Sequence, residues 1–465
     1  MMKMYSLLSI GTWARLGVAG ALLLTACAPG QDTPTPSLGF DASRYVAVGD
    51  SYTAGLSNGG LTRASQDYAY PNLLAQQFGR ASANVTFSQP TLEAGSGSGY
   101  LTLVDLPASG LLPVVRRVAG QAVVGTIISP AACGGPDTVR LLTRSATAAA
   151  LPQNLGVPGL LLTQIETVGL GNAANATPGG AFNPYFERLL PAADSRTYLQ
   201  AVATSSASAT FFTYFLGLDQ MLPYLRSGGE CGLPSSALLN ANARKILNVL
   251  TASGHQGIIA RLPAVTNLPL VRLGRGLALQ SRLQANFGDT APVYIENPLN
   301  FGPPQVISNS DYVLATALPR LGQRTEVVVN GTPLQLPYGR DSRNPIRDAD
   351  VLDKTELDRI NLVMTSYNNN LEDLATLYKM PLALDGKRTL DSNAAFPNFV
   401  GETILVNGVT YSGEPVRGNF YSLDNVSLTP RGSALLANTF ILAINSAYRA
   451  NIPAIEVNKL PTSVQ

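Results

Sequence analysis

A serine at position 51 lies where an α/β protein can expose a nucleophile. It occurs in VGDSYTAG, Val48–Gly55, directly after the apolar run Tyr45–Val48. A serine between a strand and a helix can present its hydroxyl at the helix N-terminus, where backbone N–H groups can hold an oxyanion. The triplet Gly-Asp-Ser is also typical of a turn whose serine caps the helix. The triplet alone therefore leaves both interpretations open.

A second pair of candidate residues lies in FYSLDNVSLTPRG, where Asp424 is followed three residues later by Ser427. A nucleophilic serine needs a general base, and histidine is the side chain best suited to that role near neutral pH. The only histidine of the chain is His255, in SGHQG, between an expected helix and an expected strand. We expect it at the amino end of that strand, at the edge of the sheet opposite to Ser51.

Four segments occur in the order GDSYTAG, NLGVPG, FLGLDQML and SLDNVSLTPRG. Together they resemble the four blocks of the SGNH, or GDSL, hydrolases. From about Tyr45 to the last helix the chain is similar to the bacterial lipoprotein branch of that family, and YPNLLAQQF and TPRGSALLANTFILAIN add to the likeness. The resemblance implies ester hydrolysis without a cofactor. It also implies a flavodoxin-like, three-layer α/β/α fold with a mostly parallel sheet.

The resemblance assigns roles residue by residue. Ser51 matches the family nucleophile, and its own backbone N–H would help to form the oxyanion hole. Gly159, the last residue of NLGVPG, matches the glycine whose N–H is a second donor. Asp424 matches the acid that orients the catalytic histidine.

Two positions depart from the family pattern. The family places an asparagine that donates to the oxyanion where this chain has Asp219, and an ionised carboxylate only accepts. Loss of one such donor costs on the order of 10²–10³ in turnover. The family places the general base where this chain has Ser427, and loss of a base costs on the order of 10⁶. One compensating arrangement stays open: Asp219 could act as the base toward Ser51 if it is close and desolvated.

Alternating strand and helix patterns predict the scaffold that positions these residues. The expected strands are Tyr45–Val48, Ala209–Gly217, Gln256–Pro263 and Pro381–Asp385, and the expected helices are Tyr70–Phe78, Ala237–Gly254, Asp353–Tyr378 and Thr429–Arg449. Asp353 and Glu356 have the spacing of a capping box. We predict one hydrolase-like domain over residues 41–465, with a β-rich insertion at about 95–150. The mixed-charge run Arg340–Lys354 is interpreted as a solvated connection.

The first residues are typical of a targeting segment. Residues 1–26 carry Lys3 and Arg15 and then an apolar run that is too short to span a bilayer, as in a signal peptide. The run ends in LTAC, which resembles a lipobox, so we expect Cys27 to be lipidated. Residues 27–40, which are rich in proline and polar residues, predict a flexible tether. The alternative is an ordinary signal peptide with an incidental cysteine.

Two further cysteines, Cys133 and Cys231, lie in glycine-rich loops. In an oxidising compartment we expect them to form a disulfide. One histidine and no CxxC motif argue against a metal site. The chain has 32 basic and 30 acidic residues and no long basic run, which argues against nucleic acid as a partner.

These observations predict an exported lipoprotein, held at a membrane of the bacterial cell envelope, in the periplasm or at the cell surface. Its ester-hydrolase site is expected to be impaired or inactive, and it can retain binding of a small-molecule ester or glycan, the ligands that the resemblance implies. An active serine esterase or lipase with a rearranged site around Ser51 is one alternative. A surface adhesion or scaffold module that uses the β-rich insertion is the other.

Overall fold

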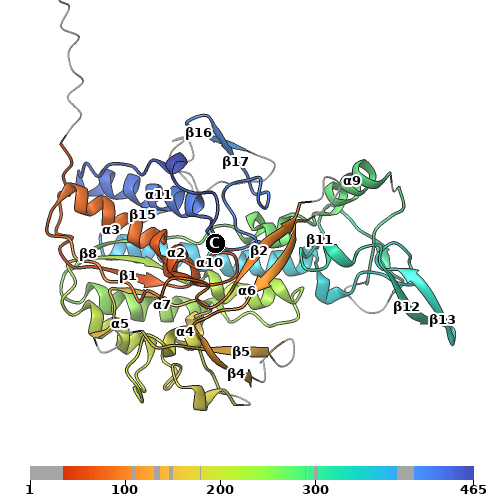
Figure 1. The fold of residues 1–465 in the computed structure, drawn as a ribbon, viewed down its shortest axis with the longest axis horizontal. Helices are drawn as coiled ribbons and strands as arrows, with labels where there is room; N and C mark the ends of the chain where they lie inside the picture. Colours follow the sequence, from red (N-terminus) through yellow and green to blue (C-terminus); the bar gives the residue numbers. More distant parts are fainter. Residues whose placement is uncertain are drawn as a thin grey trace, which may run out of the picture. The chain divides into compact units, whose positions relative to one another are not determined.

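A parallel sheet of five strands lies at the centre of the described residues (Figure 1). Its strands are β1 (Tyr45–Gly49), β6 (Asn154–Gly156), β7 (Phe211–Phe215), β8 (Gln256–Ala260) and β15 (Leu382–Ala383). Their order across the sheet is β15-β8-β7-β1-β6, and each neighbouring pair is parallel. The structure, a computed structural model, describes residues 35–106, 112–129, 133, 137–145, 150–177, 180–288, 290–297, 302–384 and 403–464. The predicted α/β class with a parallel sheet is confirmed.

The helices of the described residues are α1 (Ser51–Ala54), α2 (Arg63–Asp67), α3 (Tyr70–Ala81), α4 (Pro184–Glu187), α5 (Tyr198–Ser206), α6 (Leu218–Arg226), α7 (Ser236–Thr251), α8 (Pro269–Arg272), α9 (Gly276–Phe287), α10 (Lys354–Leu377) and α11 (Pro430–Tyr448). The strands outside the central sheet are β2 (Tyr100–Asp105), β3 (Val114–Val118), β4 (Val123–Ser129), β5 (Asp137–Leu142), β9 (Tyr294–Ile295), β10 (Gln305–Val306), β11 (Tyr312–Val313), β12 (Arg324–Val329), β13 (Thr332–Pro337), β14 (Val351–Leu352), β16 (Ile404–Val406) and β17 (Val409–Tyr411). The latter pair in antiparallel two-stranded ribbons.

Strands β1 and β7 of the central sheet are buried along their whole length, on both faces. All five residues of β1 and all five of β7 are buried, which is typical of a parallel sheet. The register aligns Tyr45 with Phe211 and Phe211 with Gln256, and it aligns Gly49 with Phe215. The residues that follow β1 and β7 therefore emerge side by side at one edge of the sheet.

The predicted helices form with caps that the sequence indicates. Before α10, the Asp353 carboxylate accepts the Glu356 N–H and the Glu356 carboxylate accepts the Asp353 N–H, so the capping box is confirmed. Pro430 is the first residue of α11, and the Thr429 hydroxyl accepts the Gly432 N–H. Helix α11 packs against α3, while α7 packs against both α5 and α10.

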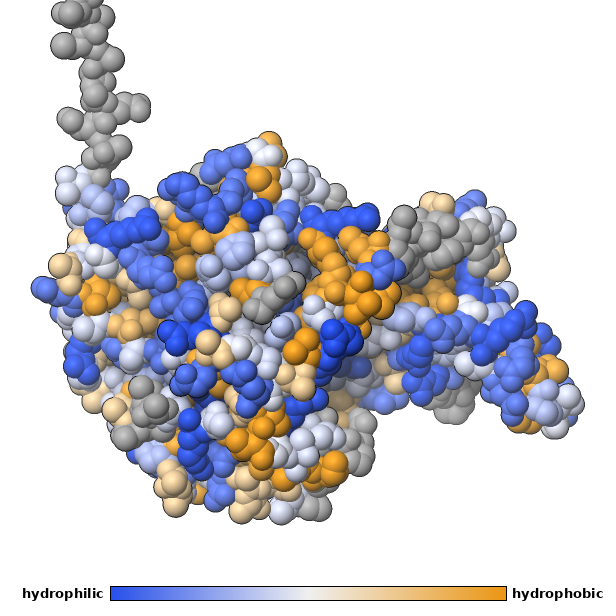
Figure 2. Space-filling model, in the orientation of Figure 1, coloured by the Kyte–Doolittle hydropathy of each residue, from blue (hydrophilic) through white to orange (hydrophobic). Residues whose placement is uncertain are grey.

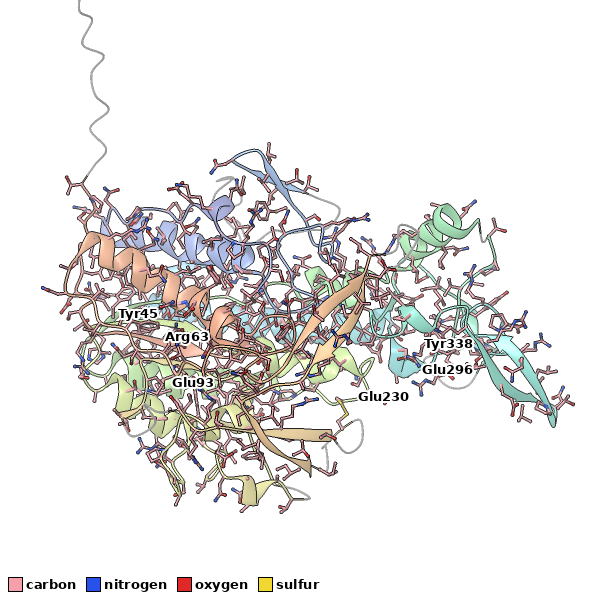
Figure 3. The ribbon with its side chains drawn as sticks, in the orientation of Figure 1. Tyr45, Arg63, Glu93, Glu230, Glu296 and Tyr338 are labelled. Atoms are coloured by element: carbon pink, nitrogen blue, oxygen red, sulfur yellow. A yellow bond between two sulfur atoms is a disulfide. The ribbon has the colours of Figure 1, made fainter. Side chains whose placement is uncertain are left out.

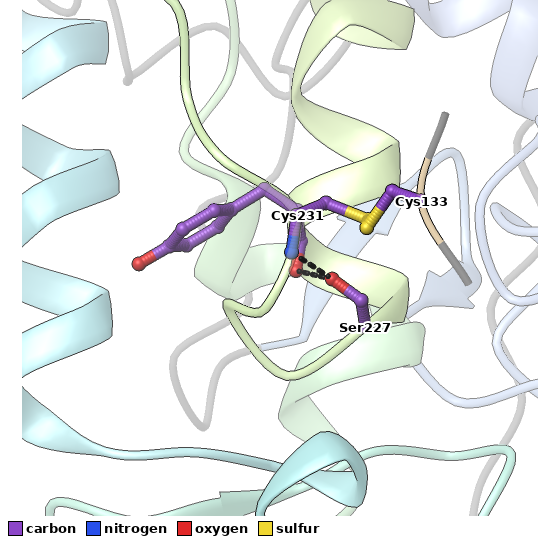
Figure 4. The surroundings of a disulfide bond; sticks show 4 residues. Cys133, Ser227 and Cys231 are labelled. Atoms are coloured by element: carbon purple, nitrogen blue, oxygen red, sulfur yellow. Dashed lines mark hydrogen bonds between the residues drawn. A yellow bond between two sulfur atoms is a disulfide. The ribbon is translucent and has the colours of Figure 1, made fainter. Parts of the chain in front are cut away.

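The β-rich insertion consists of two ribbons, β2–β3 and β4–β5. A disulfide joins Cys133, between β4 and β5, to Cys231, in the turn after α6 (Figure 4). The Cys231 N–H also donates to the Ser227 hydroxyl oxygen at 2.9 Å, which fixes the turn. The insertion is thereby covalently tied to the segment that follows the helix carrying Asp219.

A second small core forms from residues between β8 and α10 in the sequence, and it was not predicted. Its buried residues include Leu279, Ile295, Val313 and Ile346. The interpretation of residues 340–354 as a solvated connection is wrong. Ile346 is buried in this core, and the Asp350 side chain, which is only 10% exposed, forms ion pairs with Arg320 and Arg347. The pattern escaped detection because strands of two residues carry no readable periodicity.

The N-terminal predictions lie largely outside the described residues. These are the signal peptide at 1–26, the lipidation of Cys27 and residues 27–34 of the tether. The compact unit begins at Pro36, earlier than residue 41. Leu38 is buried and Phe40 packs on Phe211, with ring centroids 4.3 Å apart. In the described part of the chain, none of the helices has the length and apolar character needed to cross a bilayer.

The disulfide closes a long loop, since its cysteines are 98 residues apart in sequence. We expect the double variant Cys133→Ser/Cys231→Ser to lose about 2–5 kcal/mol of unfolding free energy, because the unfolded chain gains conformational freedom. Urea denaturation would measure this loss, and wild-type protein in dithiothreitol is the matched control. Equal unfolding midpoints with and without reductant would contradict the expectation.

Candidate active site

The candidate residues Ser51, Gly159 and Asp219 follow three neighbouring strands of the sheet. Ser51 is the first residue of α1, immediately after β1, and Gly159 follows β6. Asp219 lies in the first turn of α6, after β7. Because β6, β1 and β7 are neighbours, their carboxyl ends meet at the point where the strand order reverses, which is where α/β sheets place their binding sites.

One carboxylate oxygen holds this site together. The Ser51 hydroxyl donates to Asp219 Oδ2 at 2.5 Å. The same oxygen accepts the Ser51 N–H at 3.2 Å and the Gly159 N–H at 2.7 Å. These two N–H groups are the expected oxyanion donors, so Asp219 Oδ2 occupies the position that a substrate oxyanion would take.

Two glycines allow this arrangement. Gly159 has φ of +72°, and its N–H donates to Asp219. Gly159 itself is exposed to solvent, at the rim of the site. Gly217, before α6, has φ of +124°. A Cβ at Gly217 would lie 3.2 Å from the Tyr367 ring. Side chains other than glycine are strained at such angles.

Asp50 completes a reciprocal exchange with Asp219. Asp50 Oδ2 accepts the Gly217 N–H at 3.0 Å and the Asp219 N–H at 3.1 Å, at the start of α6. Asp219 in turn accepts the Ser51 N–H at the start of α1. Each carboxyl group thus binds the N-terminus of the helix that follows the other strand. Sequence reasoning gave Asp50 no part in the site, and its position directly after a strand was the one available signal.

Both carboxyl groups are driven toward their neutral forms. Asp219 and Asp50 are 3% and 1% exposed. Burial raises the pKa of Asp219, although the hydrogen bonds from Ser51 and Gly159 oppose this. Burial, followed by repulsion from Asp219, raises the pKa of Asp50 well above its ordinary value. Asp219 Oδ1 is buried and has no hydrogen-bond partner among the described residues.

The structure places Asp424 beside this site in a different role from the one expected. Its carboxylate accepts the N–H groups of Val426 at 2.9 Å, Ser427 at 2.7 Å and Gly59 at 2.7 Å. Asp424 therefore folds its own loop and ties that loop to the segment after α1. Tyr52 adds a hydrogen bond from its hydroxyl to the Val426 carbonyl at 2.7 Å.

Ser427 lies on this loop and is 1% exposed. Among the described residues, no hydrogen bond joins Ser51 to Ser427 or to Asp424. His255 Nδ1 lies 3.0 Å from the Leu250 carbonyl oxygen. His255 precedes Gln256, which shares its register position with Phe211 and Tyr45 at the amino end of the sheet. The length of β1 therefore separates His255 from Ser51 by roughly 20 Å.

Within the described ranges, no group of three or more histidine, cysteine, aspartate or glutamate side chains could hold a metal ion. Comparisons with protein-family models, with curated proteins and with solved structures found no match to this chain. The site is defined by its own geometry: a serine whose hydroxyl and backbone N–H are both bound to a buried carboxyl group at the carboxyl edge of a parallel sheet.

The raised pKa of Asp219 gives a pH dependence with a definite sign. Above about pH 4 the folded protein binds more protons at this group than the unfolded chain does, so wild-type stability falls as the pH rises through the folded pKa. The asparagine side chain of the variant Asp219→Asn does not titrate, and it also removes the charge that repels Asp50. We expect the stability of Asp219→Asn relative to wild type to increase as the pH rises above about 4, measured by urea denaturation.

Asp41 provides a control of opposite sign. Its pKa is lowered because its carboxylate accepts the Ser43 N–H. Asp41→Asn should therefore lose stability relative to wild type as the pH rises. If Asp219→Asn followed the same trend as Asp41→Asn, Asp219 would be ionised in the folded protein.

Proposed function

We propose that residues from about 36 onward form a three-layer α/β/α domain of the SGNH hydrolase type. The four ordered sequence blocks support this. So does the strand order, which numbered along the chain is 2-1-3-4-5, the flavodoxin-like order. The packing of α11 on α3, and of α7 on α5 and α10, is consistent with helices on the two faces of the sheet.

We propose further that the site does not hydrolyse esters by the family mechanism. The observation that carries this is the position of Asp219 Oδ2, within 3.2 Å of both the Ser51 and the Gly159 N–H nitrogens. Ester hydrolysis requires those donors to bind the developing oxyanion. A carboxyl oxygen bound there excludes that oxyanion, and an ionised one would also repel it.

The missing base supports the same conclusion. Ser427 carries a hydroxyl, which does not titrate near neutral pH and cannot collect the proton of Ser51. His255 belongs to the opposite edge of the sheet. The four donors around Asp424, including the Ser422 hydroxyl at 3.2 Å, leave it in a structural role.

The alternative of an active esterase would need Asp219 as the base. The 2.5 Å contact with the Ser51 hydroxyl oxygen favours that alternative. Two points weigh against it. A base must be ionised, whereas burial raises the pKa of Asp219. The same oxygen would also have to leave the oxyanion hole during the reaction, and it would then lose contact with Ser51.

A second candidate function is adhesion or scaffolding through the insertion. Six apolar side chains of its ribbons are 37–65% exposed: Leu103, Val104, Val114, Val115, Val124 and Ile128. Figure 2 has hydrophobic residues gathered over the region of β2 and β3. An apolar surface of this kind is typical of a contact site for another molecule, and it is compatible with a silent site at Ser51.

Export as a lipoprotein remains part of the proposal. The Cys133–Cys231 disulfide supports an oxidising compartment outside the cytoplasm. The signal peptide, the lipidated Cys27 and the membrane anchor rest on the N-terminal sequence. The ligands that the family would suggest, a small-molecule ester or a glycan, remain candidates for the exposed rim near Gly159.

We expect wild-type protein and Ser51→Ala to hydrolyse p-nitrophenyl acetate at the same background rate, because Ser51 lacks both a base and a free oxyanion hole. We also expect no labelling of Ser51 by a fluorophosphonate probe. Absorbance at the nitrophenolate band and intact-protein mass spectrometry measure the two outcomes. A faster wild type, or a probe adduct on Ser51, would reject the silent site.

The two lost groups should be restorable only together. Ser427→His supplies a base while the hole stays filled, and Asp219→Asn supplies a donor without a base. We expect the double variant to exceed either single variant in p-nitrophenyl acetate hydrolysis by on the order of 10²-fold. Adding Ser51→Ala to the double variant is the control, and it should abolish the gain. Equal activity of all variants would show that the scaffold is not that of a serine hydrolase.

A further inference from the structure

A surface cavity separate from the Ser51 site borders the second small core. Its volume is about 390 Å³, which falls within the range of about 300–1,000 Å³ that small-molecule sites occupy. Its walls come from β12, from Tyr338 directly after β13, and from the loop before β14. Tyr338 and Glu296, both of which line it, are labelled in Figure 3.

Three arginines line this cavity, and each is paired with a carboxylate. Arg343 bonds Asp341 through Nε at 2.9 Å and through Nη2 at 2.8 Å. Arg347 and Arg320 both bind Asp350, at 3.3 Å and 2.6 Å. The three arginine side chains remain 41–60% exposed. A guanidinium has five N–H donors, so donors remain after these pairs form.

Acceptors line the same cavity. Glu296 contributes a carboxylate. Glu296 Oε2 accepts the Asp348 N–H at 2.8 Å, which fixes its orientation. The Gln323 and Asn344 side chains add amide groups to the wall.

The floor of the cavity is rigid. The Tyr338 hydroxyl donates to Asp350 Oδ2 at 2.8 Å. The Arg320 guanidinium lies 5.2 Å from the centre of the Tyr338 ring. Asn344 donates to the Thr325 hydroxyl oxygen and to the Leu336 carbonyl, each at 2.8 Å. A wall that is held in this way needs little reorganisation when a ligand binds.

The charges decide which kind of ligand fits. Asp341, Asp350 and Glu296 carry three negative charges against the three arginines. An anion would meet Glu296, and a cation would meet the arginines. A neutral ligand that carries hydroxyl groups is repelled by neither kind of charge. Each of its hydroxyl groups can donate to a carboxylate and accept from a guanidinium.

We propose that this cavity binds a neutral polyhydroxylated ligand, namely a saccharide ring. Its hydroxyl groups bridge the exposed edges of Arg343 and Arg347 on one side and the Glu296 carboxylate on the other. The apolar face of the ring packs toward Val327 and Pro345. The site is independent of Ser51, so a silent hydrolase site and a working saccharide site coexist in one chain.

The test uses ligand-observed NMR titration of the purified protein with methyl glycosides of glucose, galactose and mannose. Inorganic phosphate and glucuronate are the anionic probes. We expect at least one methyl glycoside to bind saturably and more tightly than either anion. Arg343→Gln and Glu296→Gln should each weaken that binding about tenfold, since each removes a charge-assisted hydrogen bond.

Matched controls separate the cavity from general surface effects. Arg63→Gln removes an arginine that is 49% exposed and paired with Asp67, and Glu166→Gln removes a glutamate that is 51% exposed and paired with Lys245. Neither control should change the affinity. The proposal is overturned if no methyl glycoside saturates the protein, if phosphate or glucuronate binds more tightly, or if the cavity variants behave like the controls.

Discussion

The exchange of hydrogen bonds between Asp50 and Asp219 is the constraint on which the site depends. Each carboxyl group follows one strand of the β1–β7 pair and binds N–H groups at the start of the helix that follows the other strand. The first N–H groups of a helix have no partner within the helix, so a buried helix start needs one from elsewhere. Here each helix start finds that partner across the sheet, and the positions of Ser51 and Gly159 follow from it.

This exchange stabilises the resting site at the expense of the chemistry that the scaffold could perform. An oxyanion hole is useful when its donors are free until charge develops on a substrate. In this chain the donors are already satisfied by an internal oxygen. Burial raises the pKa of that oxygen's carboxyl group, which disfavours the ionised form that a base at the Ser51 hydroxyl would need.

Much of the parallel sheet, and the meeting of Ser51, Gly159 and Asp219, could be predicted from the sequence. Long apolar runs that end in glycine-rich turns are readable as buried parallel strands, and parallel strands bring their carboxyl ends together. The hydrogen-bond partners of Asp50 could not be predicted from the sequence. A carboxylate that binds a helix 167 residues away and one that caps its own turn look identical in sequence. The hydrogen bonds of Asp424 could not be predicted for the same reason, since its partners are backbone N–H groups.

The mixed-charge run after β13 illustrates a further limit of sequence reasoning. Alternating arginine and aspartate residues are typical of a solvated surface, and the same alternation forms the paired walls of a cavity. The difference lies in burial: Ile346 is fully buried, and the Asp350 side chain is only 10% exposed where it holds Arg320 and Arg347. Those contacts are set by a second core that assembles from strands of two residues and from packing distant in sequence. The arrangement around Asp219 and the paired walls around Asp350 therefore differ in how readily a sequence reveals them: the first follows conspicuous sequence blocks, and the second does not.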